Sequence, residues 1–404
     1  MTQLSNALTN RQADLGGMHG ANQTGLRDHN ERLVLSLIQR HGSLASVELA
    51  RLTRLSPQTV SVIMRKLEAD NLVLKSQPIR GKVGKPLTPV ALNSDGVRAL
   101  GLIIGRRASE LATIDFNGRL LTRRETVYPY PTPERVMDFV RENLPQMMDE
   151  LGEAGRASLA GIGVSAPFQL WNWLTSVNAP KDQMDRWQGF DVASAVAEIS
   201  GLEVSFQNDV TSACTAEHIY GRGREFDDYA YFYIGSFIGG GIVLGGTVYP
   251  GRTGNAGAVG SLPMPDGAGR MTQLIRNASI YTLEADIIAA NKDPSGLWKF
   301  PRDWAGYEDE VAPWITNTAR HLALGTVAVC SVIDFEAVLI DGAFPDAIRA
   351  RVVAETRIAL AQVDTQGITR PRVEEAKVGR NARVIGSAAL PILARYLLSQ
   401  KMFR

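Results

Sequence analysis

The segment at residues 229–261, YAYFYIGSFIGGGIVLGGTVYPGRTGNAGAVGS, is the most informative part of the chain. It opens with a β-rich aromatic run, passes through three consecutive glycines at 239–241, and reaches a two-glycine turn at Gly245 and Gly246. This pattern predicts a hairpin of two strands. Glycines at such a bend let the backbone approach a ligand, because no Cβ blocks the way. A bulged hairpin without a ligand explains the same glycines.

Length and composition indicate a soluble protein with more than one domain. The chain has 404 residues, of which 45% are hydrophobic and 21% charged, and this length suggests two or three domains. No run of 18 apolar residues could span a bilayer, and residues 1–25 are polar with no apolar signal-peptide core. We therefore expect a cytoplasmic protein with no membrane partner and a flexible arm at residues 1–25.

The two cysteines, Cys214 and Cys330, stand far apart in the chain. In a long chain this usage favours buried free thiols. Neither a disulfide nor a thiolate zinc site is expected.

Charge is unevenly distributed along the chain. Residues 1–95 carry 12 Lys and Arg against 7 Asp and Glu, a net charge of +5, whereas the remainder carries 31 against 35, a net charge of −4. A basic front end on an acidic body predicts that the front end meets a polyanion.

Residues 30–69 carry the pattern of three successive helices. Hydrophobic periodicity predicts a helix over 30–40 and a short helix over 47–52. Ser56 and Pro57 then supply an N-cap followed by proline at the first helical position. The third helix is predicted to bury Val60, Ile63, Met64 and Leu67.

The exposed positions of the third helix are polar or cationic, as in a recognition helix that enters the major groove. A strand at 72–74, a basic loop with glycines, and a strand at 87–92 complete a winged helix-turn-helix. The residues expected to contact DNA are Gln58, Thr59, Ser61, Arg65, Lys66, Arg80, Lys82 and Lys85. A three-helix interaction module with a solvated basic face is the alternative, and the agreement of cap, turn, wing and charge favours DNA.

The glycine framework of 229–261 resembles the signature of the ROK family (repressor, open reading frame, kinase). In that family the stretch reads GTGIGGG and later GEIGH, and here further glycines recur at 251, 254, 257 and 260. Phe237 stands where the second glycine is usual, Ala258 where the glutamate is usual, and Ser261 where the histidine is usual. The sequence GKVGKP at 81–86 also resembles the GRGRP wing of ROK repressors.

The resemblance implies an α/β fold, in which an N-terminal winged helix-turn-helix precedes a two-lobed ribonuclease H-like domain of the actin and hexokinase type. The pattern after residue 100 agrees, with three β-segments, a helix at 134–151 and a strand at 159–167. Asn117 and Gly118, between the second and third segments, are a strong hairpin signal. The expected domains are residues 26–95 and 96–404.

The resemblance further implies a sugar site between the two lobes. Gln207, Asn208 and Asp209 match the family's END motif, and Asp209 takes the position of the base that deprotonates a sugar hydroxyl. An N-cap on the following helix is an equally good role for Asp209. The residues expected at a small sugar or polyol are Asn178, Asn208, Asp209, Gly239, Gly257 and Ser261.

The nucleotide side of the family site is altered in this chain. Family kinases carry DxGGT after the first strand, where this chain reads IIGRRAS, with Ile103 near the aspartate position. Arg106 and Arg107 either bind an anionic ligand or lie on a surface turn. The family's CxCGxxGC zinc loop corresponds to LPMPDGAGRMTQL, which has no cysteine. We therefore expect no metal, no cofactor and no kinase activity.

These patterns favour a transcriptional regulator, a repressor of carbohydrate-metabolism genes that acts as a homodimer or dimer of dimers. Its kinase-like domain would sense a sugar-like effector, and lobe closure would shift the population between two arrangements of the DNA-binding heads. An active carbohydrate kinase with a fused DNA-binding domain is the alternative. A scaffold with a vestigial pocket is a third hypothesis, and operator binding, ATP turnover and thermal shifts with sugars separate the three.

Overall fold

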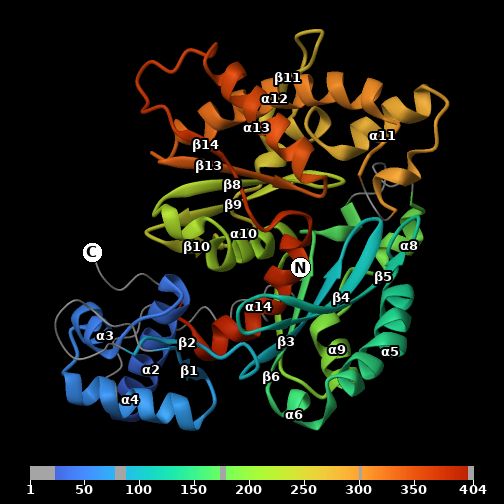
Figure 1. The fold of residues 1–404 in the computed structure, drawn as a ribbon. Coiled ribbons are helices and arrows are strands. Elements are labelled where there is room, and N and C mark those ends of the chain that lie inside the picture. The colour runs from blue at the N-terminus through green and yellow to red at the C-terminus, as the bar shows by residue number, and fades with distance from the viewer. Residues whose placement is uncertain (1–22, 78–87, 173–178, 300–302, 399–404) are drawn as a thin grey trace. The chain divides into compact units, whose positions relative to one another are not determined.

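A computed structural model of the chain describes residues 23–77, 88–172, 179–299 and 303–398 (Figure 1). The chain divides into two compact units. Unit 1 comprises residues 1–207 and 387–399, and unit 2 comprises residues 208–386 and 400–404.

The N-terminal part of unit 1 is a winged helix-turn-helix. Its elements are α2 (Gln23–His41), α3 (Ser46–Thr53), α4 (Pro57–Ala69) and the antiparallel strands β1 (Val73–Lys75) and β2 (Val90–Leu92). Leu44, between α2 and α3, bridges to Val90, so the helices close onto the wing strands. The predicted buried face of α4 is confirmed, because its four members are at most 4% exposed: Val60, Ile63, Met64 and Leu67.

The remainder of unit 1 is built on a five-stranded sheet in the order β5-β4-β3-β6-β7. The strands are β3 (Arg98–Ile104), β4 (Ala108–Asp115), β5 (Leu120–Val127), β6 (Leu159–Ala166) and β7 (Val204–Asn208). The first three along the chain are antiparallel neighbours, and β6 runs parallel to β3. Asn117 and Gly118 make the β4–β5 turn as predicted, with Gly118 at a φ of 80°.

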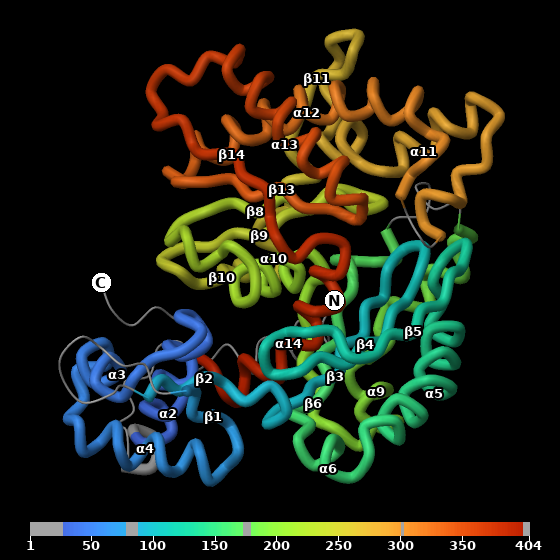
Figure 2. The backbone as a smooth tube through the Cα atoms, in the orientation of Figure 1, coloured from blue at the N-terminus to red at the C-terminus, as the bar shows by residue number. Residues whose placement is uncertain are grey.

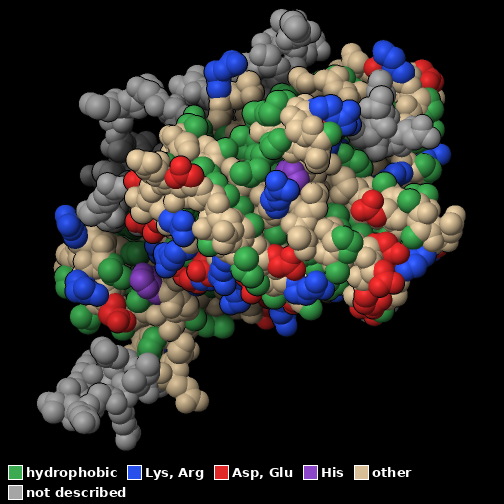
Figure 3. Space-filling model, turned by 90° about the horizontal axis from the view of Figure 1, so that it is seen from above, with side chains coloured by type: hydrophobic (Ala, Val, Ile, Leu, Met, Phe, Trp, Pro, Cys, Tyr) green, Lys and Arg blue, Asp and Glu red, His purple; other side chains and the backbone are tan. Residues whose placement is uncertain are grey.

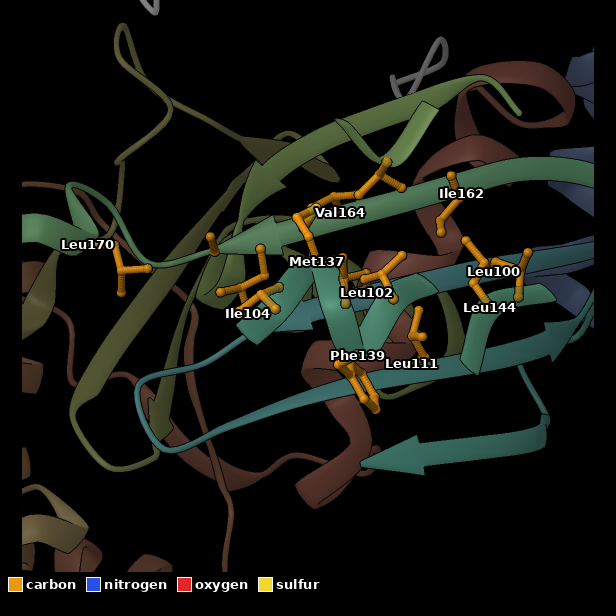
Figure 4. Packing of buried hydrophobic residues seen from close by; sticks show 14 of the residues in the cluster. Leu100, Leu102, Ile104, Leu111, Met137, Phe139, Leu144, Ile162, Val164 and Leu170 are labelled. Carbon is orange, nitrogen blue, oxygen red and sulfur yellow. The ribbon is translucent and has the colours of Figure 1, made fainter. Parts of the chain in front are cut away.

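Helices α5 (Pro133–Glu150), α6 (Gly152–Ala157), α8 (Lys181–Asp185) and α9 (Val192–Ser200) complete this part of unit 1. Thr132 caps α5 by accepting a hydrogen bond from the backbone N–H of Arg135. The apolar face of α5 packs on the sheet, as Figure 4 shows. Fully buried members of this core include Leu100, Leu102, Leu111, Val140, Leu144, Ile162 and Val164. Each such side chain contributes about 1.5–3 kcal/mol by leaving water.

Unit 2 repeats the same sheet design. Its sheet has the order β10-β9-β8-β13-β14, with β8 (Tyr229–Ile234), β9 (Ile238–Leu244), β10 (Thr247–Tyr249), β13 (Ala337–Gly342) and β14 (Arg372–Glu375). As in unit 1, three strands joined by hairpins are antiparallel, and the next strand pairs in parallel with the first of them. This repeated topology agrees with the predicted ribonuclease H-like fold class.

The helices of unit 2 are α10 (Asp209–Tyr220), α11 (Ile280–Ala289), α12 (Glu308–Cys330), α13 (Asp346–Leu360) and α14 (Ala382–Tyr396), whose residues from Ser387 onward belong to unit 1. Strands β11 (Pro263–Pro265) and β12 (Met271–Gln273) form a separate antiparallel pair. Figure 2 traces α12, β13, α13 and β14 as consecutive orange and red segments. α12 and α13 are joined by a 2.8 Å hydrogen bond from Thr316 to Glu355.

The glycine triplet lies inside β9 and not at a bend, which corrects the predicted two-strand hairpin to a three-stranded meander of β8, β9 and β10. A Cβ on Gly239 would lie 2.9 Å from Val210, and one on Gly241 would lie 2.4 Å from Cys214, both residues of α10. These two glycines therefore let a helix pack directly on the strand. The turn itself is at Gly245 and Gly246, where both φ angles are positive.

Both cysteines are free and buried, as predicted. Within the described ranges, no helix has the length and apolar character needed to cross a bilayer. On the face drawn in Figure 3, basic and acidic side chains are interspersed over the described surface. That face therefore carries no extended surface of a single charge.

Candidate functional site

Helix α4 is anchored at its N-terminus and presents a polar face. The hydroxyl of Ser56 accepts a 3.0 Å hydrogen bond from the backbone N–H of Thr59, which confirms the predicted cap. Gln58, Ser61 and Arg65 are exposed on the side opposite the buried residues. A capped helix start that exposes amide, hydroxyl and guanidinium groups suits a phosphate backbone and base edges.

Two other predicted DNA contacts on α4 are engaged inside the protein. The hydroxyl of Thr59 lies 2.8 Å from that of Ser56. The ammonium group of Lys66 lies 2.6 Å from Glu31 on α2, so it ties the two helices together. The predicted wing contacts lie outside the described residues: Arg80, Lys82 and Lys85.

The start of α10 holds the two polar residues of the predicted effector site. The side-chain oxygen of Asn208 accepts hydrogen bonds from the backbone N–H groups of Val210 and Thr211, at 3.0 and 3.1 Å. Asn208 is therefore the N-cap, and the alternative that gives this role to Asp209 is wrong. Asp209 is the first helical residue, 4% exposed.

The carboxylate of Asp209 has a cationic partner from α14. A guanidinium nitrogen of Arg383 lies 3.4 Å from the Oδ2 atom of Asp209. The same guanidinium lies 5.6 Å from the ring centroid of Tyr233, at the end of β8. Its side chain is only 22% exposed, so the pair is partly shielded from water and held against an aromatic face. Arg383 therefore holds the carboxylate of Asp209 in place from a second helix.

The other residues predicted to contact an effector lie in different surroundings. Gly257 packs on β9, since its Cβ would lie 2.8 Å from the backbone of Gly240, and its φ is +78°. Gly239 has Val210 of α10 beside it, so packing accounts for both glycines. Ser261 is exposed at the end of the 3-10 turn η4 (Val259–Ser261), and Asn178 lies outside the described residues.

The β3–β4 connection is a tight turn in unit 1. The N–H of Gly105 donates to the carbonyl of Ala108, and the hydroxyl of Tyr128 donates to the carbonyl of Gly105. Arg107 donates to the carbonyl of Pro129 at 3.0 Å. This arrangement favours the surface-turn interpretation of the IIGRRAS segment over an anion site.

The corresponding region of unit 2 is filled by protein groups. The ring of Phe237 is 7% exposed and lies 5.0 Å from the ring of Tyr281 on α11. At the end of β13, the fully buried Asp341 accepts hydrogen bonds from the N–H of Gly379 and the hydroxyl of Tyr231. Burial raises the pKa of Asp341, while these donors oppose that effect.

The family is decided by the sequence comparison. The model of the ROK family matches residues 99–393, well over half of the chain. The chain belongs to the ROK family. A second model, of a winged helix-turn-helix DNA-binding domain, matches residues 27–73. The resemblance seen in the glycine framework is thereby confirmed.

Two of three similar proteins are described as regulators. It is 23% identical over 375 residues to "Uncharacterized protein y4fQ" of Sinorhizobium fredii, covering 91% of each chain. It is 23% identical over 238 residues to "DNA-binding transcriptional dual regulator NagC" of Escherichia coli, covering 58% of this chain and 57% of that protein. It is 21% identical over 242 residues to the xylose repressor of Bacillus subtilis, covering 60% and 62%. The matches to the two named regulators thus span less than two thirds of their length.

Solved ROK structures have the same fold. A ROK family transcriptional regulator described as a homolog of the E. coli MLC protein superimposes with a TM-score of 0.63, at 19% identity over 92% of this chain and 97% of that one. A ROK family glucokinase from Streptomyces griseus, in complex with glucose and AMPPNP, gives a TM-score of 0.57 at 20% identity, over 72% and 98%. Regulators and kinases therefore share this ROK fold, and it does not distinguish between them.

Sequence reasoning missed Arg383 at the candidate effector site, and also Arg32 and Ser36 at the junction of α2 with α14. Arg383 stands 174 positions from its partner Asp209, and nothing local predicts the pair. Arg32 of α2 donates to the carbonyls of Leu393 and Leu397 at the C-terminal end of α14, within unit 1. Ser36 reinforces this junction by accepting a hydrogen bond from the N–H of Leu398 at 2.8 Å. A guanidinium on the last carbonyls of a helix is a favourable cap, but its position is set by the tertiary fold.

Proposed function

We propose that this protein is a transcriptional repressor that binds duplex DNA through α4 and the wing and whose ROK domain binds a small sugar-like effector. The observation that carries the proposal is the capped helix α4, with Gln58, Ser61 and Arg65 exposed on one face, in the same chain as a ROK domain. Relatives described as a DNA-binding transcriptional dual regulator and as a xylose repressor support it.

The proposal includes the organisation predicted from the sequence. The DNA-binding domain extends over residues 26–95 and the ROK domain over 96–404, in a cytoplasmic homodimer or dimer of dimers. Two winged helices related by a two-fold axis suit an operator with two half-sites. The contacts of Arg32 and Ser36 with the end of α14 give the DNA-binding helices a direct connection to the last ROK helix.

We further propose that the ROK domain binds its effector without phosphorylating it. Phosphoryl transfer depends on phosphate-cradling turns and electrostatic stabilisation more than on a base. Here the carboxylate of Asp209 is paired with Arg383, and a buried phenylalanine, Phe237, stands in the glycine segment. The active kinase remains the alternative, because Asp209 itself is present and kinases share the fold.

The first prediction concerns DNA. Full-length protein should select duplexes from a random library, and its affinity should fall steeply as salt rises, because bound cations release the counterions of the phosphates. Arg65→Ala should weaken binding to a selected duplex by roughly tenfold or more, as expected for the loss of a base or phosphate contact on α4. Fluorescence anisotropy at several salt concentrations measures both effects.

Arg141→Ala is the matched control, since Arg141 is an exposed arginine on α5 that pairs with a neighbouring carboxylate, Asp138. Its affinity should equal that of the parent protein. If the full-length protein binds no duplex at low salt, the regulator proposal is wrong. An equal loss of DNA affinity in Arg65→Ala and Arg141→Ala would show that α4 is not the helix that recognises DNA.

The second prediction is binding without turnover. In a panel of hexoses, amino sugars and polyols, at least one compound should raise the melting temperature of the protein while ATP consumption stays at background. Asp209→Ala should abolish that thermal shift, because the variant loses an acceptor for sugar hydroxyls. Calorimetry with the active compound and a coupled ATP assay provide the two measurements.

A known sugar kinase assayed in parallel establishes that the ATP assay works. Asp185→Ala, at a partly exposed carboxylate that pairs with Lys181 on α8, is a control that should keep the thermal shift. ATP turnover that disappears in Asp209→Ala would promote the kinase alternative. An effector bound equally well by Asp209→Ala would remove this site assignment.

A further inference from the structure

An apolar side chain interrupts the polar face of α4. Val62 is 44% exposed although it is apolar. Its neighbours behave as their polarity predicts, because Ser61 is exposed and Ile63 is buried. Gln58, Val62 and Arg65 stand at positions i, i+4 and i+7 of the helix, so their side chains share one surface. Val62 therefore lies in the middle of the surface that the proposed function presents to DNA.

The chemistry of the major groove limits what such a side chain can recognise. Base edges there offer donors and acceptors, and the C5 methyl group of thymine is the apolar feature among the four standard bases. A β-branched aliphatic residue without donor or acceptor gains most by covering that methyl group, because both surfaces leave water together. The exposure of Val62 in the free protein leaves this surface available for such a contact.

We propose that Val62 is a specificity residue that reads a thymine methyl group in each operator half-site. The inference rests on the proposed DNA-binding function. Val62 lies about 6 Å along the helix axis from Gln58 and about 4.5 Å from Arg65, given a rise of about 1.5 Å per residue. Because base pairs are about 3.4 Å apart, the thymine lies within about two base pairs of those that Gln58 and Arg65 contact.

The test uses full-length protein and a duplex selected from a random library. Each thymine of the half-site is replaced in turn by deoxyuridine, which removes the methyl group and leaves every hydrogen-bonding group in place. At one position the substitution should weaken binding by parent protein about fourfold, the value expected for one buried methyl group. Val62→Ala should bind the thymine and deoxyuridine duplexes equally at that position.

Val127→Ala is the control, because Val127 is an exposed apolar residue, 68% exposed, on β5 of the ROK domain, outside the winged helix-turn-helix. It should discriminate as the parent does. Parent protein that binds the selected duplex but shows no deoxyuridine effect at any position overturns the inference while the proposed function stands. Discrimination that persists in Val62→Ala also overturns it, and absence of any duplex binding defeats the proposed function together with the inference.

Discussion

Gly386→Ala is expected to lower the free energy of unfolding by about 3 kcal/mol or more. Gly386 lies inside α14, where its backbone passes close to α10 within unit 2. A Cβ at this position would lie 1.7 Å from the carbonyl oxygen of Ser212 and 2.4 Å from its carbonyl carbon. These are backbone atoms of a packed helix, so no side-chain rotation relieves the clash, and the two helices must separate. Urea denaturation followed by circular dichroism measures the loss.

A second glycine inside a helix supplies the matched control. Gly325 lies within α12, and a Cβ there would meet its nearest neighbour, the side chain of Leu274, at an ordinary 3.4 Å. Gly325→Ala should be neutral or stabilising by up to about 1 kcal/mol, because alanine is the better helix former. Similar losses in the two variants would show that close packing of α10 and α14 is not the cause.

The local features of the fold were predictable from the sequence because they depend on neighbouring residues. The cap at Ser56, the buried stripe of α4 and the hairpin at Gly118 follow from short-range rules, and all three are confirmed. The role of the glycine triplet did not follow. Its spacing indicated a bend near a ligand, whereas Gly239 and Gly241 make room for α10, whose contacting residues precede them by more than 25 positions.

The residues of the candidate sites likewise divide into those set by neighbouring residues and those set by distant ones. Gln58, Ser61 and Arg65 could be placed on an exposed face from periodicity alone, and the structure agrees. The pairing of Lys66 with Glu31, and of Asp209 with Arg383, joins segments far apart in the chain. Such pairs leave no periodic signal in one sequence, so they became visible only in three dimensions.

The other large effect on stability is expected at a buried carboxylate in unit 2. Glu217 of α10 is fully buried. Its oxygens accept hydrogen bonds from the backbone N–H groups of Arg222 at 2.7 Å, Lys377 at 3.0 Å and Val378 at 2.9 Å. One side chain therefore joins the end of α10 to the segment that follows β14. Removing it leaves these three partly buried backbone N–H groups without their acceptor, at a cost of about 1–3 kcal/mol for each one that water cannot reach.

Glu217→Ala is accordingly expected to lower the free energy of unfolding by at least about 3 kcal/mol. Glu225→Ala is the control, because Glu225 is half exposed and its ion pair with Arg222 is at the surface. That variant should lose at most about 1 kcal/mol. Urea denaturation of the three proteins gives the comparison, and a Glu217→Ala variant as stable as the control would contradict the proposed role of the carboxylate.

The same carboxylate makes stability depend on pH in a specific direction. Burial, followed by the proximity of Asp341, raises the pKa of Glu217 to about 7. Since the unfolded value is about 4.3, the folded protein binds more protons than the unfolded chain between roughly pH 4.5 and 7, and stability falls as pH rises through that window. Glu217→Gln cannot titrate, so its stability relative to the parent should improve from pH 5 to pH 7, by on the order of 2–3 kcal/mol. Asp341, whose pKa burial also raises, contributes to both proteins and largely cancels in the difference. If the difference in stability between parent and Glu217→Gln stays constant from pH 5 to pH 7, or changes in the opposite direction, Glu217 remains ionised throughout.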